Sequence, residues 1–246
     1  MRVVVLGCGT GVGKTRLSVA LLRALVGRGL PALGLKPIES GIEIDAKIER
    51  ADTHAAPSGS DAAALALAGS VQTQLRHPLY ALRAPVSPHL AARTSGIQID
   101  VQLVVDWVAK AESLVTPHVV PHRSLWTIVE TAGGVFSPLA PGVSNFELAQ
   151  ALEPALWLLV AADSLGVLHD VSSASRAMRA CGREPDHLVL SGAREPDASS
   201  GNNAAELATL GIATPSAVLA RNDDRGVDAL VERLLETQPR PGPYTR

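Results

Sequence analysis

Short apolar segments alternate along the chain with longer segments in which apolar residues recur at helical spacing. The first pair illustrates the pattern: Arg2–Leu6 is rich in β-branched residues, and in Lys14–Gly27 the apolar residues share one helical face. The segments predicted as strands are Arg2–Leu6, Ala32–Lys36, Leu125–Glu130, Ala155–Ala161, Leu188–Ser191 and Ser216–Leu219. The segments predicted as helices are Lys14–Gly27, Ala62–Ala68, Val101–Leu114, Val167–Cys181, Asn203–Leu210 and Val227–Thr237. Such alternation is typical of an α/β fold, so we predict a doubly wound, mostly parallel sheet with helices on both faces.

No internal repeat or change in composition divides this pattern, so we predict a single domain over residues 1–236. The remaining residues, 237–246, contain Pro239 and Gly242 and are predicted to form a loose tail. The polar stretches Glu43–Ser60 and Glu195–Asn203 are predicted loops.

Composition and charge narrow the classes of partner. The 246 residues carry a formal net charge of -2, which argues against nucleic acid or an anionic membrane as an electrostatic partner. Cys8 and Cys181 are too few for a disulfide framework and fit a reducing compartment. No apolar run reaches the roughly 18 residues of a membrane span. We therefore expect a cytoplasmic protein.

The residues that follow the first predicted strand, from Gly7 to Thr15, read GCGTGVGKT. Glycines allow a backbone to curl so that its N–H groups surround an anion, and the helix that begins at Lys14 adds the positive end of its dipole. In such a loop Lys14 can reach the β- and γ-phosphates of a nucleotide, and the Thr15 hydroxyl can ligate Mg²⁺. A dinucleotide-binding loop fits less well, because Val12 stands at the third glycine position and the second strand ends in Lys36 instead of an acid. We therefore predict a P-loop NTPase-like fold.

Two carboxylates are candidate metal ligands. Glu130 ends an apolar strand and precedes a glycine-rich turn, which would deliver an acid to the phosphate end of a parallel sheet. Asp61 heads the helix Ala62–Ala68, where it could ligate metal or simply cap the helix, and the residues alone do not separate these two roles.

Lys36 ends the second predicted strand and is followed by Pro37, Ser40 and Gly41. Ligands of open α/β sheets bind outside the carboxyl ends of the strands, so Lys36 and Lys14 could face one phosphate chain and stabilise the charge that develops during phosphoryl transfer. The alternative is an ordinary exposed lysine before a turn.

The combination and order of these motifs resemble the ATP-dependent dethiobiotin synthetases of biotin biosynthesis. The resemblance extends from Val3 to about Leu219 and rests on Val12-Gly13-Lys14-Thr15, Lys36-Pro37-x-x-Ser40-Gly41, Ser60-Asp61, Ser87-Pro88-His89 and Val129-Glu130-x-Ala132-Gly133-Gly134. It implies a homodimeric ligase that uses ATP, Mg²⁺ and CO₂ or bicarbonate to convert 7,8-diaminononanoate to dethiobiotin, ADP and phosphate. The implied intermediates are an N-carbamate and a carbamic-phosphoric anhydride.

The resemblance also implies roles for residues. Lys36 would be the catalytic lysine that holds the carbamate, with Lys14 as the second catalytic lysine, and the Mg²⁺ ligands would be Thr15, Asp61 and Glu130. The residues implied to bind ATP and its metal are Gly11, Val12, Gly13, Lys14, Thr15, Arg16, Asp61, Glu130, Thr131, Ala132, Gly133, Ser191, Gly192, Pro215, Ser216 and Ala217. The residues implied to contact the diamine substrate are Thr10, Lys36, Ser40, Gly166 and His169, the last two across a subunit interface, although His169 could equally be a surface helix residue.

The sequence also departs from the family pattern: Gly9 and Gly11 stand where acidic residues are common, and Ser191-Gly192 stands where an asparagine-containing pair usually reads adenine. Two alternatives therefore stay open. One is a partitioning-type switch ATPase, although Gly9 replaces its usual loop lysine and Val227–Thr237 is too acidic for a membrane-binding helix. The other is a diverged homologue that binds nucleotide without turnover.

Overall fold

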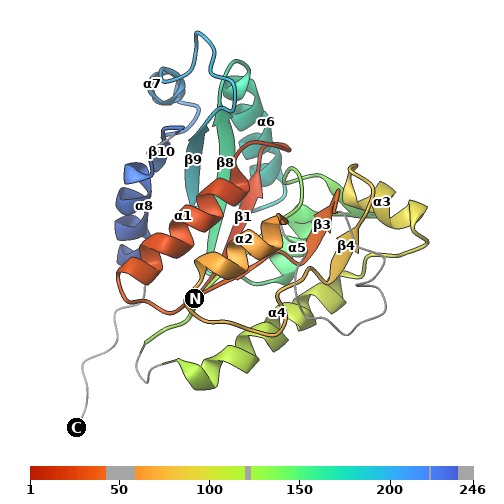
Figure 1. The fold of residues 1–246 in the computed structure, drawn as a ribbon. Coiled ribbons are helices and arrows are strands. Elements are labelled where there is room, and N and C mark those ends of the chain that lie inside the picture. The colour runs from red at the N-terminus through yellow and green to blue at the C-terminus, as the bar shows by residue number, and fades with distance from the viewer. Residues whose placement is uncertain (43–58, 120–122, 222, 238–246) are drawn as a thin grey trace.

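The computed structural model describes residues 1–42, 59–119, 123–221 and 223–237 of the chain. Its main sheet has six strands in the order β10-β9-β8-β1-β5-β2, and every neighbouring pair is parallel. These strands are β1 (Arg2–Gly7), β2 (Ala32–Leu35), β5 (Trp126–Glu130), β8 (Leu156–Asp163), β9 (His187–Gly192) and β10 (Ala217–Leu219). Because β1 is central and β5 lies between β1 and β2, the loops that follow these three strands meet at one edge of the sheet (Figure 1).

Helices cover both faces of this sheet (Figure 1). One layer contains α1 (Lys14–Gly27), α2 (Asp61–Ala68) and α8 (Arg225–Glu236), and the other contains α4 (Val101–Val115), α5 (Asn145–Ala151), α6 (Val167–Ala180) and α7 (Asn203–Thr209). The alternation of side chains along β1 explains the two layers: Val3 and Val5 belong to the apolar cluster of the first, Val4 and Leu6 to that of the second. The predicted doubly wound fold is confirmed.

Several short elements were not predicted. β3 (Ile38–Ser40) pairs in parallel with β4 (Tyr80–Leu82), and β6 (Pro138–Ala140) pairs antiparallel with β7 (Val143–Ser144). The helices α3 (Pro88–Thr94) and α5 and the 3₁₀ helix η1 (Thr116–His118) were not predicted either. The four strands and η1 span only two or three residues each, too few to reveal a hydrophobic period in the sequence.

Predicted element ends lie within two residues of the observed ones. The second strand ends at Leu35, so Lys36 lies just beyond it, and Cys181 is the C-cap of α6 and lies outside the helix. The stretch Glu195–Asn203 is irregular up to α7, as expected, and is held by the buried Asp163 carboxylate, which accepts hydrogen bonds from Gly201 N at 2.8 Å and Asn203 Nδ2 at 2.7 Å. The predicted tail after Thr237 and most of the stretch Glu43–Ser60 lie outside the described residues. Among the described helices, none combines the length and apolarity needed to cross a bilayer.

Candidate active site

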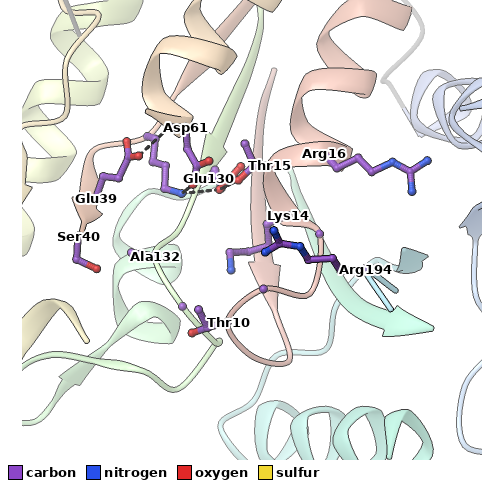
Figure 2. Close-up of a pocket in the computed structure, with 14 residues that line it drawn as sticks. Thr10, Lys14, Thr15, Arg16, Glu39, Ser40, Asp61, Glu130, Ala132 and Arg194 are labelled. Atoms are coloured by element: carbon purple, nitrogen blue, oxygen red, sulfur yellow. Dashed lines mark hydrogen bonds and ion pairs between the residues drawn. The ribbon is translucent and has the colours of Figure 1, made fainter. Parts of the chain in front are cut away.

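A pocket of about 590 Å³ opens where the loops after β1, β2 and β5 meet (Figure 2). This position follows from the parallel sheet, because the carboxyl ends of its strands lie at one edge. The residues that line it are Thr10, Gly11, Gly13, Lys14, Thr15, Arg16, Lys36, Glu39, Ser40, Asp61, Glu130, Ala132, Gly133 and Arg194.

The loop between β1 and α1 adopts a conformation that depends on glycine. Gly13 is the N-cap of α1 and has a φ of 93°, and a Cβ at this position would lie 2.2 Å from Ser191 Oγ. A larger residue would therefore be strained and would also clash with β9. Lys14 follows immediately and is buried, and among the described residues the one hydrogen bond of its Nζ is a long one, to Gly9 O at 3.4 Å. Burial, with the nearby Lys36, lowers the pKa of Lys14 to about 8 against the opposing effect of Glu130.

Glu130 joins the phosphate loop to the second strand. It is fully buried, and its Oε1 accepts hydrogen bonds from Thr15 Oγ1 and Lys36 Nζ, both at 2.8 Å. Its Oε2 accepts a hydrogen bond from Ser18 Oγ at 2.8 Å. A buried carboxylate needs such partners to offset the loss of hydration, so Glu130 is held by two hydroxyls of α1 and by the lysine that follows β2.

Lys36 is only 7% exposed and forms ion pairs with both Glu130 and Asp61. Burial alone would lower the pKa of Lys36, but Glu130 and Asp61 more than reverse this effect, and the pKa is raised above its usual value. The ammonium is therefore charged near neutral pH. The alternative of an exposed lysine before a turn is wrong.

Asp61 is the first residue of α2, and its carboxylate reaches Lys36. The N-cap is Ser60, whose Oγ accepts a hydrogen bond from Ala63 N at 3.1 Å. The interpretation of Asp61 as the capping residue is therefore wrong, and its carboxylate belongs to the pocket.

The donor set at Thr15, Asp61 and Glu130 fits Mg²⁺. Mg²⁺ prefers hard oxygen ligands and usually takes one or two carboxylates while phosphates and water complete its shell. The structure brings one hydroxyl and two carboxylates together around Lys36. Within the described part of the chain, no group of three or more His, Cys, Asp and Glu side chains could hold a metal, so an all-protein cage is not present there.

Comparison with known proteins decides the family. A family model described as an AAA domain matches residues 1–227. The chain is 34% identical to the ATP-dependent dethiobiotin synthetase BioD of Caulobacter sp. (strain K31), with 94% of this chain and 93% of that protein covered. It is also 34% identical to the protein of the same name from Anaeromyxobacter dehalogenans (strain 2CP-C), with 89% and 90% covered. This chain belongs to the ATP-dependent dethiobiotin synthetase family.

Family membership confirms the resemblance seen in the sequence. The fold is also similar to that of the cell division ATPase MinD of Pyrococcus furiosus, with a TM-score of 0.54 over 96% of this chain and 99% of that one. The sequence identity of that pair is 16%, so this similarity concerns the P-loop fold alone.

Some residues implied by the dethiobiotin synthetase resemblance do not line the pocket. Val12 packs against the apolar cluster beneath α1, and Thr131 is buried and donates its hydroxyl to Val5 O at 3.1 Å. Ser191 is 1% exposed and lies against Gly13, beside the half-buried Gly192. The implied nucleotide contacts of these four residues remain predictions.

The positions Pro215, Ser216 and Ala217 lie at the amino-terminal end of β10. Ser216 bonds to the amino end of β9, through its N to Leu188 O at 2.7 Å and its Oγ to His187 Nδ1 at 2.9 Å. The structure therefore does not bring these three positions to the carboxyl ends of the strands, where the pocket lies. Gly166 and His169, at the start of α6, are exposed and also lie outside the pocket lining of this single chain.

Four residues near the pocket were not predicted from sequence. Glu39 and Arg194 line it, Ser18 bonds to Glu130, and the buried Asn145 donates to Ala132 O at 2.6 Å and to Gly134 O at 2.8 Å. Burial raises the pKa of the Glu39 carboxyl, although backbone N–H groups of Ala62 and Asp61 partly oppose this. Only Ser18 had a signal in the sequence: it lies three residues after Thr15, so a helix places both side chains on the same face. The sequence pattern gave no comparable signal for Glu39, Arg194 or Asn145.

Proposed function

We propose that this chain catalyses the ATP-dependent carboxylation and ring closure of 7,8-diaminononanoate to dethiobiotin. The observation that carries the proposal is the placement of two buried lysines, Lys14 and Lys36, in one pocket with Asp61 and Glu130. A pocket of this charge pattern suits a triphosphate and a small anion bound next to each other. Family membership supports the reaction class.

The phosphate loop is proposed to bind the triphosphate. Gly11 and Gly13 line the pocket at positive φ, and the helix α1 begins behind them, so backbone N–H groups and the helix dipole favour anionic oxygens. Lys14 has one long hydrogen bond to a carbonyl, and a phosphate oxygen would give its ammonium a charged partner. Arg16 lines the same pocket, but its guanidinium bonds to Ala220 O and Asp224 and is directed away from Glu130 (Figure 2).

Lys36 is proposed to hold the carbamate. One amine of the diamine attacks CO₂ and loses a proton to solvent, which gives the carbamate anion. A carbamate oxygen then attacks the γ-phosphorus of ATP, and the bond between that phosphorus and the leaving ADP breaks. The second amine attacks the carbamate carbon, loses a proton and expels phosphate, which closes the cyclic urea. Lys36, Thr10 and Ser40 line the wall where the diamine would lie, so Lys36 would stabilise negative charge at the transferring group.

Mg²⁺ is proposed to be held by Thr15, Asp61 and Glu130. When bound, it would neutralise charge on the phosphate oxygens. The three side chains contact one another or Lys36 directly, so the same residues would orient the nucleotide and the carbamate.

The proposal includes a homodimer in which Gly166 and His169 reach the diamine carboxylate of the partner's site. Gly166 is the N-cap of α6 and His169 lies in its first turn, where the helix dipole favours a carboxylate, and both residues are exposed outside the pocket lining. A contact of this kind needs a second copy of the chain.

One assay tests the function: purified protein, diaminononanoate, bicarbonate and Mg²⁺ with a panel of nucleoside triphosphates, followed for dethiobiotin. We expect product with the unmodified chain and a loss of about 10³-fold or more in turnover for Lys36→Ala and Lys14→Ala, because each removes a charge that stabilises the transferring group. Lys110→Ala, at an exposed position of α4, is the matched control and should retain full activity.

Turnover of Lys36→Ala at the unmodified rate would contradict the assignment of Lys36. ATP hydrolysis that ignores the diamine but responds to DNA or lipid would instead favour a switch ATPase.

A further inference from the structure

Glu39 is a buried carboxylate of the pocket to which neither the sequence motifs nor the proposed reaction gives a role. It is 7% exposed, and its oxygens accept two backbone hydrogen bonds from the start of α2: Oε1 from Asp61 N at 2.7 Å and Oε2 from Ala62 N at 3.0 Å. Figure 2 shows Glu39 and Asp61 on the same side of the pocket.

These two N–H groups have no partner within the helix. The first N–H groups of any α-helix lack an intrahelical acceptor, and an N-cap side chain satisfies only one or two of them. Ser60 Oγ takes the N–H of Ala63, and Glu39 takes those of Asp61 and Ala62. Ser60 is the N-cap that directly precedes the helix, whereas Glu39 belongs to a different element, β3.

The backbone of Glu39 is itself fixed. It lies in β3, where Glu39 pairs with Ala81 of β4, and the preceding Ile38 is buried in the core. Lys36 lies two residues before β3, in the same segment of chain, and forms an ion pair with the Asp61 carboxylate. Asp61 is therefore held at two points from one segment, by Glu39 at its backbone and by Lys36 at its side chain.

We infer that Glu39 is a positioning residue that holds Asp61 where its carboxylate can ligate the nucleotide's Mg²⁺. The inference rests on the metal site of the proposed function. Asp61 stands at the end of a helix, so a small shift of the first turn would move its carboxylate relative to Glu130 and Thr15. Ligand groups must be held within about 0.5 Å of the productive geometry, and residues that orient metal ligands are worth about 10- to 100-fold in metal affinity.

The test measures Mn²⁺ binding in the presence of ADP by electron paramagnetic resonance, without turnover. Glu39→Gln keeps the volume but offers one acceptor oxygen and turns an NH₂ group toward the second N–H donor. We expect its Mn²⁺ dissociation constant to rise about tenfold, the lower end of the range for residues that orient metal ligands. Ser60→Ala is the matched control: it also removes a hydrogen bond from the first turn of α2 but leaves both Glu39 bonds intact, and its dissociation constant should stay within about twofold of the unmodified value, a change of about 0.4 kcal/mol.

A double-mutant cycle separates positioning from general stability. If Glu39 acts through Asp61, then Glu39→Gln adds no further loss of Mn²⁺ affinity in the Asp61→Asn background. Glu39→Asp keeps the charge on a shorter side chain and supplies a second variant if Glu39→Gln does not fold. Its Mn²⁺ dissociation constant should lie between those of the unmodified protein and of Glu39→Gln. Equal effects of Glu39→Gln and Ser60→Ala, or additive effects of Glu39→Gln and Asp61→Asn, would overturn the inference.

The failure of the inference and that of the proposed function give different results. A chain that makes dethiobiotin but binds Mn²⁺-ADP normally after Glu39→Gln retains the function and loses the inference. A chain that shows the predicted cycle but makes no dethiobiotin retains the inference and loses the function.

Discussion

Lys14 and Lys36 show how partners decide the behaviour of one residue type within one pocket. Both are buried, and burial alone disfavours the charged form of each. Lys36 has two carboxylates as partners and its pKa is raised, whereas Lys14 donates to Gly9 O, an uncharged partner, and its pKa is lowered to about 8. A polyphosphate bound beside Lys14 would stabilise its ammonium and raise its pKa. This is the physical reason to expect that Lys14 binds an anion.

The two cysteines differ in burial, which allows a residue-level prediction. Burial, together with Asp170, raises the pKa of the Cys8 thiol to about 12, while Cys181 is exposed at the end of α6. Because the thiolate is the reactive form, a maleimide at pH 7.5 should modify Cys181 and leave Cys8 unmodified in the folded protein. Mass spectrometry of the digested protein measures this, and labelling in guanidinium chloride should then modify both. Equal labelling of the two thiols in the folded protein would contradict the raised pKa and the partial burial of the Cys8 thiol.

At the scale of elements, α5 supports the pocket although none of its residues lines it. Its first residue, Asn145, is fully buried and donates to the carbonyls of Ala132 and Gly134 in the loop after β5. A capping box between Ser144 and Glu147 fixes the start of the helix. The wall formed by Ala132 and Gly133 is therefore held from behind by a helix on the opposite side of the loop.

Asn145→Leu tests this support. The substitution removes two hydrogen bonds to buried carbonyls, and we expect the free energy of unfolding to fall by about 1–3 kcal/mol per carbonyl left unpartnered. Urea denaturation measures the change, and the dissociation constant for ADP should rise because the pocket wall loosens. Gln150→Leu, at an exposed position of the same helix, should change neither quantity appreciably. An Asn145→Leu protein as stable as the unmodified one would show that the loop holds its shape without α5.

At the scale of the whole molecule, the pocket lies at the carboxyl ends of the strands, and no residue at the start of α6 lines it. Leu165, immediately before α6, is 83% exposed, and Gly166 and His169 are exposed beside it. An apolar side chain this exposed gains free energy when a partner covers it. In the proposed homodimer, Leu165 would be covered and the start of α6 would face the pocket of the second copy.

Leu165→Glu tests the homodimer. Because Leu165 has few contacts within its own chain, we expect the folded structure to persist while the molecular mass in sedimentation velocity falls from that of a dimer to that of a monomer. The KM for the diamine should rise with little change in nucleotide affinity. Leu210→Glu, at a position 59% exposed beyond α7, should leave the mass unchanged. A monomeric unmodified protein, or a dimer that survives Leu165→Glu, would contradict this arrangement.

The parts of the fold and site that the sequence predicted are local. The strand, phosphate loop and helix from Arg2 to Gly27 were predicted with nearly their observed bounds, because hydrophobic periods report which face of one element is buried and glycines report the turn between elements. The position of Glu130 was predicted for the same reason, since an acid that ends an apolar strand of a parallel sheet must lie at the ligand-binding edge.

The tertiary structure alone decided which atoms meet between elements. It joined Glu39 to the backbone of Asp61, placed Ser191 behind Gly13, and left Pro215, Ser216 and Ala217 at the amino end of β10. These contacts depend on strand order, register and the approach of helix ends, none of which has a period along the chain. The sequence by itself determined the chemistry gathered at one edge of the sheet, and the packing of separate elements determined which residues hold that chemistry in place.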